Sequence, residues 1–564
     1  MIVMTLNEAA DHITSTDPRF ALGFESIRGV DYKILKNAPK NLRDMLQEHR
    51  PAHGDGADDY LVYEDQRWTY DAFCNDANRL SNVLTQKLGI KPGDRVALAM
   101  RNYPELLITM MATINIGAVV VFLNGWWTTE ELDYALLDSN AKLVFADGER
   151  IQRLQPLVAS HQLNLVAVRD GEGQAKQSFT DLLQKAENKD WPSVTILPDD
   201  DFAIMYSSGT TGHPKGVVLT HRGAVSSIYS WWLTQLLMPL MADPDILAQK
   251  PVRPQSALVI TPLFHVTATH SMFLLSIPTG AKLVLMYKWD AAEAVRLIQQ
   301  EQVTRFMGVP TQSADLMDQA RDLDVDLPSL EFVGSGGAKR PPNQVNELQD
   351  CFPAAAIASG WGMTETNAIG LGILGPDYVA HPAAAGRLYP PLQELKIIDD
   401  SGSELSNGEV GEITVKSAAN MRCYLNKPEA TAEVLRDGWL RTGDLARVDD
   451  EGYVTIVDRK KNIIIRGGEN IACLDVEGAL HRHPAVQEAG VFAVPHERLG
   501  EVVGAGIQLR VGHTTDAVEL SAFLADHIAA YKIPDHYWFQ SEDLPRGATD
   551  KTDRRALRQQ CLGK

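Results

Sequence analysis

Short apolar runs alternate with longer segments of helical apolar spacing over most of this chain. We expect strands at Arg95–Met100, Ala118–Leu123, Leu143–Ala146, Asp201–Tyr206, Ala257–Thr261, Leu283–Met286, Arg305–Pro310, Phe332–Gly334 and Ala355–Ser359. Residues 289–301 carry apolar positions at the spacing of a helix. Strands that alternate with helices build βα units, whose sheets are largely parallel. The pattern therefore predicts an α/β fold with a large N-terminal domain of stacked, mostly parallel sheets.

The pattern changes near Leu395 to short strands closed by Gly and Asp turns. These strands, at Leu395–Ile398, Glu412–Val415 and Tyr453–Val457, predict a small β-rich lobe at about 390–458. After it, helices are expected at Ile471–His481 and Thr515–Ala530 and strands at Val486–Val494 and Gly504–Leu509. We therefore predict an N-terminal domain at 1–458 and a small α+β C-terminal domain at 459–564. Residues 1–40 carry no pattern that predicts an element.

Composition narrows the class of protein and its partners. The 564 residues have a formal net charge of −20, with 45% hydrophobic and 22% charged residues. This acidic balance argues against nucleic acid as a partner, because no global basic field is present to displace phosphate counterions. Five scattered cysteines without a Cys-x-x-Cys pair fit a reducing cytoplasm and disfavour a structural zinc.

Targeting and membrane signals are absent from the sequence pattern. Glu8, Asp11 and Asp17 stand where a signal peptide would be apolar, and no apolar run reaches the length of a membrane span. We therefore expect a cytoplasmic protein without an integral membrane segment. This expectation is compatible with peripheral membrane contact and with a homodimer.

The densest local chemistry lies at residues 206–217, Tyr-Ser-Ser-Gly-Thr-Thr-Gly-His-Pro-Lys-Gly-Val. Glycines let backbone N–H groups approach anionic oxygens, hydroxyls add donors and Lys215 adds positive charge, so the segment is suited to holding a polyphosphate. It is not a P-loop, because Gly209 and Gly212 are three residues apart and His213-Pro214 separate Gly212 from Lys215. An ordinary surface loop has a similar composition, so its wider context decides its meaning.

That segment resembles the phosphate-binding loop of the adenylate-forming superfamily, which contains acyl- and aryl-CoA synthetases, firefly-type luciferases and nonribosomal-peptide adenylation domains. Five further segments follow in the superfamily's order, at Pro262–His265, Ser359–Glu365, Trp439–Asp444, Asp458–Ile471 and Leu544–Leu557. Six ordered motifs over about residues 60–560 are too specific for coincidence. The resemblance implies ATP, CoA and a carboxylic acid as substrates, Mg²⁺ as the metal, and a C-terminal domain that rotates between two half-reactions.

The resemblance also implies a role for each matching residue. The expected ATP-binding residues are Ser207, Ser208, Gly209, Thr210, Thr211, Gly212, Lys215, Gly336, Trp361, Gly362, Met363, Asp444 and Arg459. The expected catalytic residues are Thr364, Glu365 and Lys551, with Glu365 and, more weakly, Thr210 as Mg²⁺ ligands. The acyl pocket is expected at His265, Gly334, Gly360 and Ala368, the hinge at Lys461, and the CoA side at Arg466, Gly467 and Gly468.

The motif around Lys551 departs from the family pattern. The family usually has glycine before this lysine and an apolar residue after it, whereas this chain has Asp550 and Thr552. Asp550 places a negative charge beside a lysine that is expected to meet phosphate. The assignment to Lys551 depends on spacing and on the flanking Pro545, Arg554 and Arg555.

The leading functional hypothesis is an acyl-CoA synthetase for an aliphatic, medium- to long-chain carboxylic acid. Arg466–Ile471 most resembles fatty acyl-CoA synthetases, and the many small residues expected at the pocket would leave room for a chain. Three alternatives stay open: a CoA ligase for an aromatic or cyclic acid, an acyl-AMP ligase that loads a carrier protein, and a relative that binds ligand without turnover.

Overall fold

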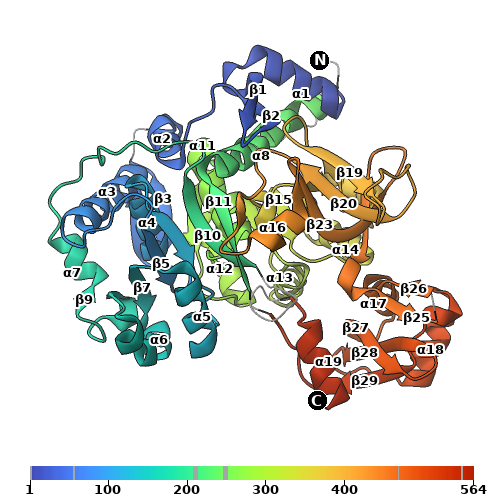
Figure 1. Ribbon diagram of the computed structural model, residues 1–564. Helices are drawn as coiled ribbons and strands as arrows, with labels where there is room; N and C mark the ends of the chain where they lie inside the picture. The colour runs from blue at the N-terminus through green and yellow to red at the C-terminus, as the bar shows by residue number, and fades with distance from the viewer. Residues whose placement is uncertain are drawn as a thin grey trace.

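The computed structural model describes residues 3–54, 57–207, 214–245, 252–467, 469–547 and 551–563. Figure 1 shows a large N-terminal body and a smaller C-terminal domain, which contains the end of the chain. Two long sheets form the centre of the body. Within the described ranges, no helix combines the length and the apolarity needed to cross a membrane.

The first long sheet is parallel through its centre, from β10 to β9, and antiparallel where β10, β11 and β21 pair. Its strands, in spatial order, are β21 (Cys423–Tyr424), β11 (Lys215–Thr220), β10 (Asp201–Ser207), β6 (Val119–Phe122), β5 (Arg95–Ala99), β7 (Leu143–Asp147), β8 (Leu165–Val168) and β9 (Gln177–Ser178). The central strands are buried on both faces, as their continuous apolar runs predict.

The second long sheet is parallel from β16 to β3 and antiparallel at its two ends. Its strands, in spatial order, are β18 (Arg387–Leu388), β17 (Leu371–Leu374), β16 (Ala356–Trp361), β15 (Phe332–Gly336), β14 (Arg305–Gly308), β12 (Ser256–Val259), β13 (Lys282–Leu285), β3 (Asp59–Tyr63) and β4 (Gln66–Thr69).

Helices cover these sheets. They are α1 (Leu6–Thr16), α2 (Leu42–Glu48), α3 (Tyr70–Gln86), α4 (Pro104–Asn115), α5 (Thr129–Ser139), α6 (Gly148–His161), α7 (Phe179–Gln184), α8 (His221–Met241), α10 (Val266–Ala268), α11 (Leu275–Thr279), α12 (Ala291–Glu301), α13 (Pro310–Asp322), α14 (Pro342–Cys351), α15 (Gly375–Ala380) and α16 (Pro428–Val434). Helix α4 begins at a proline, which suits the first helical position, and all of its residues except Glu105 are buried. The largest apolar cluster joins both sheets around it.

The β-rich lobe is a separate antiparallel sheet of β19 (Glu394–Ile398), β20 (Gly411–Lys416), β23 (Trp439–Val448), β22 (Leu435–Arg436) and β24 (Val454–Arg459). The C-terminal domain has its own core. Its sheet contains β26 (Glu469–Ile471), β25 (Ile464–Arg466), β28 (Gly500–Leu509), β27 (Val486–His496) and β29 (His536–Gln540), and its helices are α17 (Cys473–Leu480), α18 (Ala517–Ala525) and α19 (Arg554–Leu562). The predicted α/β fold with a small α+β C-terminal domain is confirmed.

Several element ends differ from the sequence prediction for physical reasons. The helix expected at 289–301 begins at Ala291, because the Asp290 side chain accepts the N–H of Glu293 as an N-cap. The helix expected at 471–481 begins at Cys473, since β26 pairs with β25 just before it. Within residues 1–40, where no element was expected, α1 starts with a Thr5–Glu8 capping box and β1 (Leu22–Ile27) pairs with β2 (Val30–Leu35).

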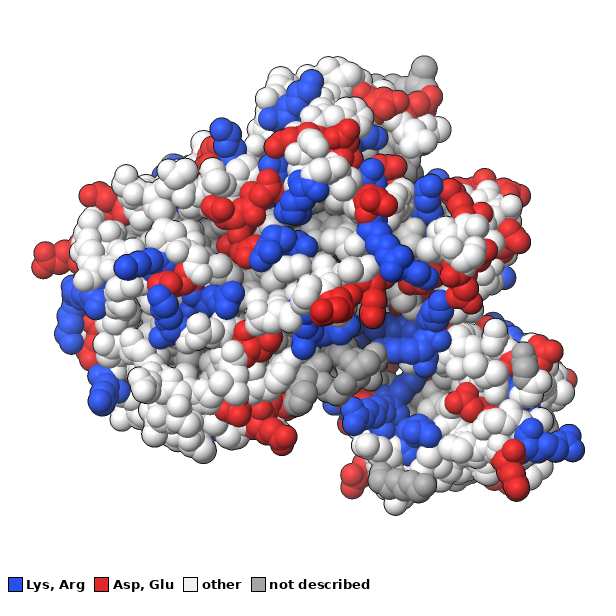
Figure 2. Space-filling model, viewed as in Figure 1, with Lys and Arg blue, Asp and Glu red and all other residues white. Residues whose placement is uncertain are grey.

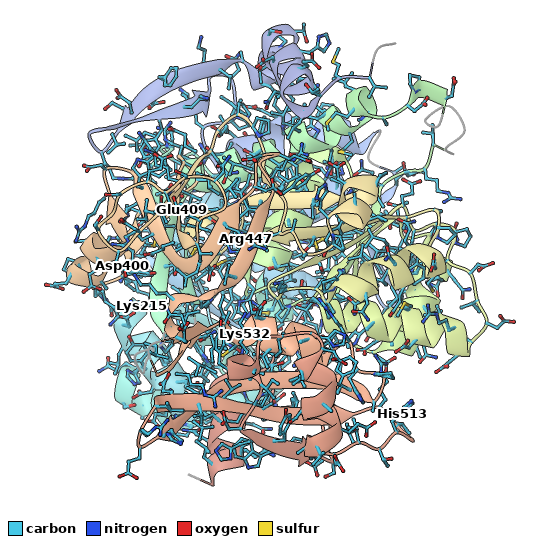
Figure 3. The ribbon with its side chains drawn as sticks, turned by 90° about the vertical axis from the view of Figure 1, so that its right-hand side faces the viewer. Lys215, Asp400, Glu409, Arg447, His513 and Lys532 are labelled. Carbon is cyan, nitrogen blue, oxygen red and sulfur yellow. The ribbon has the colours of Figure 1, made fainter. Side chains whose placement is uncertain are left out.

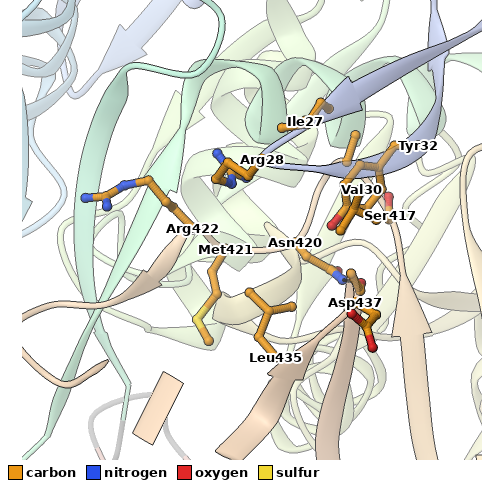
Figure 4. A pocket seen from close by; sticks show the side chains of 12 residues that line it. Ile27, Arg28, Val30, Tyr32, Ser417, Asn420, Met421, Arg422, Leu435 and Asp437 are labelled. Atoms are coloured by element: carbon orange, nitrogen blue, oxygen red, sulfur yellow. Dashed lines mark hydrogen bonds between the residues drawn. The ribbon is translucent and has the colours of Figure 1, made fainter. Parts of the chain in front are cut away.

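The β1–β2 hairpin also closes a small pocket of about 200 Å³ against the β-rich lobe (Figure 4). Arg28 and Tyr32 of the hairpin and Asn420 of the lobe line it. The pocket contains none of the residues that the sequence predicts for the active site.

Candidate active site

Several of the predicted residues converge where the carboxyl ends of β15 and β16 meet the β-rich lobe. Ligands bind at such ends in open α/β sheets. Gly336 and Gly360 are direct partners across the β15–β16 pair. Gly362 is tightly packed, since a Cβ there would lie 2.1 Å from the carbonyl oxygen of Ala368, whose own φ is +65°. A side chain at 362 therefore has no room, which explains a glycine at this turn.

Asp444 lies on β23 and is 5% exposed. Its Oδ2 accepts a hydrogen bond from Trp361 Nε1 at 2.8 Å, and its Oδ1 lies 3.1 Å from Arg459 Nε. Asp444 and Arg459 are also backbone partners in the β23–β24 pair. A carboxylate has about four lone-pair sites, so two bonds leave acceptor capacity for the hydroxyls of a ribose. Three residues predicted to bind ATP thus form one bonded group.

Glu365 follows β16 in a 3₁₀ turn, η5 (Thr364–Thr366), and is 5% exposed. Tyr424 donates its hydroxyl to Glu365 Oε1 at 2.8 Å, and the Lys215 ammonium lies 4.7 Å from the centre of the Tyr424 ring. Burial, with the nearby Glu365 carboxylate, raises the pKa of Tyr424, so its hydroxyl stays protonated as a donor. Thr364 and Met363 lie in the same turn.

The described residues contain no group of three or more His, Cys, Asp and Glu side chains able to hold a metal. Mg²⁺ in a nucleotide site does not require one, because it is usually held by one or two carboxylates together with substrate phosphates and water. The buried Glu365 carboxylate fits that requirement. Thr210, the weaker predicted ligand, lies outside the described residues.

Only the base of the predicted phosphate loop is described. Ser207 ends β10 and pairs with Lys215 at the start of β11. The five residues between them that were predicted to bind ATP, Ser208, Gly209, Thr210, Thr211 and Gly212, lie outside the described residues. Burial lowers the pKa of Lys461, and Lys215, which Figure 3 labels, is one of the positive groups that add to this, so the loop begins near the domain boundary.

Lys551 reaches across that boundary to Gly337. A Cβ placed on Gly337 would lie 2.7 Å from Lys551 Cε and 3.0 Å from its Nζ, and Gly337 has a left-handed φ of +78°. Burial lowers the pKa of Lys551 to about 8, with the positive Arg459 adding to the effect and the negative Asp444 opposing it. The predicted catalytic lysine therefore lies with Asp444 and Arg459, although more than a hundred residues separate it from Asp444 in the chain.

His265 lies in the same region. Its ring packs against Phe264 with centroids 4.7 Å apart, and its Nε2 is buried without a hydrogen-bond partner among the described residues. Burial lowers the pKa of His265 to about 3, and the charge of Lys551 adds to this. The imidazole is therefore neutral at pH 7 and leaves one unsatisfied nitrogen close to Lys551, where a substrate group could bind it.

Basic side chains gather where the C-terminal domain faces the body (Figure 2). Lys461, the predicted hinge residue, lies in η6 (Lys460–Asn462) directly after β24. Burial lowers its pKa to about 8, and the positive Arg459, Arg554 and Lys215 contribute to this. Such a concentration of positive charge in an acidic protein suits a polyphosphate substrate.

Arg466 and Gly467, the described residues of the predicted CoA side, make their contacts inside the C-terminal domain and not with Asp444, Arg459 or Lys551. Arg466 binds within the C-terminal domain, where Nη1 donates to the Tyr531 carbonyl at 2.6 Å and Nη2 lies 2.8 Å from Asp535 Oδ1. Gly467 has a φ of +59° and donates its N–H to the Leu499 carbonyl. Gly468 lies outside the described residues. This structure thus places Lys551, and not Arg466, at the predicted ATP site.

The predicted acyl pocket is only partly supported by the geometry. Ala368 and Gly360 lie beside Trp361 on neighbouring backbone, but Gly334 does not open onto free space. A Cβ there would lie 2.4 Å from the Phe332 ring and 3.0 Å from the Met307 sulfur. Small residues here make room for protein atoms, which removes one argument for a wide pocket.

Sequence reasoning missed Tyr424. It lies on a strand of two residues, β21, whose local pattern carries no signal, and its bond to Glu365 joins residues 59 positions apart. The hydrogen bond between Trp361 and Asp444 was also missed, because it joins residues 83 positions apart and no local pattern signals it.

Comparison with known proteins agrees with this geometry. Residues 49–425 match the model of the AMP-binding enzyme family, and residues 475–551 match that of the AMP-binding enzyme C-terminal domain. A feruloyl-CoA synthase from Amycolatopsis sp is 35% identical over 86% of this chain and 92% of its own, and a long-chain-fatty-acid–CoA ligase from Bacillus subtilis is 32% identical over 88% and 90%. The o-succinylbenzoate coenzyme A synthetase of Bacillus subtilis, solved with ATP and a magnesium ion, superposes with a TM-score of 0.76 at 27% identity, over 91% of this chain and 99% of its own. The chain therefore belongs to the AMP-binding enzyme family of adenylate-forming proteins and is an AMP-forming acid–thiol ligase.

Proposed function

We propose that this protein is an acyl-CoA ligase for an aromatic carboxylic acid, which it activates as an acyl-adenylate before transfer to CoA. The single observation that carries the catalytic part is the position of Lys551 beside Asp444 and Arg459. A lysine from the C-terminal domain at a nucleotide site of the N-terminal body is the arrangement that adenylation requires.

In the first half-reaction, a carboxylate oxygen of the acid attacks the α-phosphorus of ATP, and pyrophosphate leaves. Negative charge develops on the phosphate oxygens, so fixed positive charge nearby lowers the barrier. Lys551 and Lys215 are two of the cations near this site, and Asp444 is the acceptor for the ribose. Magnesium, which Glu365 would hold together with the phosphates, supplies further charge neutralisation. Tyr424 keeps the Glu365 carboxylate in place by its hydrogen bond.

In the second half-reaction, the thiol sulfur of CoA attacks the acyl carbonyl, and AMP leaves. We propose that residues 459–564 rotate about Lys461 to bring Arg466, Gly467 and Gly468 to the site and to withdraw Lys551. The bonds of Arg466 to Tyr531 and Asp535 lie inside the C-terminal domain, so they can move with it as a unit.

The substrate assignment differs from the aliphatic acid expected from the sequence. It is supported by a relative named for ferulate, by a solved structure named for o-succinylbenzoate, and by the crowding at Gly334. Flat side chains lie next to His265, since Phe264 packs against it and also contacts Trp126 with ring centroids 5.3 Å apart. Aromatic rings pack favourably against such surfaces. A relative named for long-chain fatty acids supports an aliphatic acid as the second candidate substrate.

A panel of acids tests this proposal. Ferulate, o-succinylbenzoate, benzoate, octanoate and palmitate would each be assayed for AMP release with and without CoA. We expect kcat/KM to be highest for an aryl acid and AMP release to require CoA. A preference for octanoate or palmitate would overturn the aromatic assignment, and pyrophosphate exchange without CoA-dependent thioester would favour transfer to a carrier protein. Absence of pyrophosphate exchange with every acid would contradict catalysis.

A further inference from the structure

The loop that carries Lys551 is closed at its base by backbone contacts. Arg546 and Thr552 form an antiparallel β-bridge. Within this bridge, the Gly547 N–H donates to the Lys551 carbonyl at 2.7 Å, and outside it the Asp553 N–H donates to the Pro545 carbonyl at 2.7 Å. The backbone on both sides of Lys551 therefore forms a short stem, and the direction of the stem sets where the lysine can reach.

One carboxylate holds both sides of this stem. Glu488 lies on β27 and is 8% exposed. Its Oε2 is 2.6 Å from Arg546 Nη2, and its Oε1 accepts the Thr552 hydroxyl at 2.6 Å. Thr552 also lies against β27, because a Cβ on Gly490 would lie 3.3 Å from its methyl group. The stem is thus fixed to the sheet from both of its strands.

The two bonds are of the strong kind. A hydrogen bond to an ionised carboxylate is shorter and roughly twice as strong as one between neutral groups. Glu488 is also shielded from water, so water does not easily replace either partner. Opening or tilting the stem would leave a buried carboxylate with an unpaired oxygen, which is costly. The contact between Lys551 and Gly337 therefore rests on a stem with little freedom to move.

We propose that Glu488 is a positioning residue for adenylation, which acts through Arg546 and Thr552 to hold Lys551 at the nucleotide site. This inference rests on the proposed role of Lys551. It also gives a reason for Thr552 at a position where the family usually has an apolar residue, because the threonine hydroxyl can donate to Glu488 and an apolar side chain cannot.

The role predicts a loss confined to one half-reaction. Glu488→Gln keeps the size of the side chain and an oxygen that can accept from Thr552, but it removes the ionic bond to Arg546. A displacement of about 1 Å in a catalytic group can cost on the order of 100-fold in rate, so we expect kcat for ATP–pyrophosphate exchange to fall by about 10- to 100-fold. Thioester formation from supplied acyl-adenylate should be unchanged, because Lys551 serves only the first step.

Two further variants separate positioning from simple loss of stability. Thr552→Val removes one of the two bonds and should give a smaller loss of the same kind, so it tests the proposal even if Glu488→Gln folds poorly. Asp475→Asn is the matched control: it breaks a carboxylate–lysine pair of the same domain, the 2.5 Å contact with Lys532, without touching the stem. Its two half-reactions should both stay at the wild-type rate.

A pH profile adds a readout that stability alone would not move. If the stem loosens, Lys551 becomes more hydrated and its pKa rises from about 8 toward its ordinary value, so the alkaline decline of pyrophosphate exchange should shift to higher pH.

Equal losses in both half-reactions, or no loss in either, would overturn the positioning role. If Lys551→Ala itself retained pyrophosphate exchange, the proposed function would fail first. Normal exchange in Glu488→Gln beside an inactive Lys551→Ala would refute the role of Glu488 alone.

Discussion

The lowered pKa of Lys551 makes a quantitative prediction about adenylation at alkaline pH. Lysine is cationic only below its pKa, and burial lowers that pKa from 10.5 to about 8. The protonated fraction of Lys551 should therefore fall from about 90% at pH 7 to about 50% at pH 8 and about 10% at pH 9. If the cation is required, kcat/KM for ATP in pyrophosphate exchange falls about tenfold for each further pH unit.

The ratio kcat/KM is the correct quantity, because it reports the ionisation of the free enzyme, whereas bound ATP would raise the pKa of the lysine. Lys551→Arg is the decisive variant. A guanidinium stays protonated throughout the accessible range, so the alkaline decline should disappear from the residual activity. Thioester formation from supplied acyl-adenylate should show no decline that depends on residue 551.

Lys461 complicates the measurement, since its pKa is also lowered to about 8. The same profile would therefore be recorded for Lys461→Arg, which should keep the alkaline decline of adenylation. If the decline near pH 8 persisted in Lys551→Arg and disappeared in Lys461→Arg, the titrating cation would be Lys461. The reasoning about Lys551 would then be wrong.

Three further substitutions follow from the geometry. Gly337→Ala places a methyl group 2.7 Å from Lys551 Cε at a φ of +78°, so adenylation should fall at least tenfold while thioester formation from acyl-adenylate persists; equal effects would contradict it. Tyr424→Phe removes the hydroxyl bound to Glu365, so the KM for MgATP should rise severalfold, and an unchanged Mg²⁺ titration would refute this role. His221 is fully buried, with its pKa lowered to about 3, so the unfolded chain binds more protons below pH 6.5 and stability is lost as pH falls. From pH 6.5 to 4.5 this loss is about 2.3 kcal/mol, and denaturant titrations of His221→Asn should show a correspondingly weaker pH dependence.

The sequence predicted elements well where the apolar pattern was continuous. The strand expected at Asp201–Tyr206 is β10, and that expected at Glu412–Val415 is β20, each within a residue or so at its ends. Ends were predicted less well where a cap or a pairing partner decides them, as at Asp290 and Glu469. These contacts depend on backbone geometry that the apolar pattern does not contain.

The site was predictable residue by residue but not as a network. The motifs pointed to Trp361, Asp444 and Lys551 separately, whereas the bond from Trp361 to Asp444 and the approach of Lys551 to Gly337 depend on how the two domains and the lobe pack. No local pattern carries that information. Residue size was a misleading guide at Gly334, where the space beside the glycine is filled by a neighbouring ring.

We propose that Lys551 serves adenylation and not thioester formation. The most direct test is the Lys551→Ala enzyme, assayed for ATP–pyrophosphate exchange and, separately, for thioester formation from supplied acyl-adenylate and CoA. We expect exchange to be abolished while thioester formation stays largely intact. An equal fall in both half-reactions would contradict it.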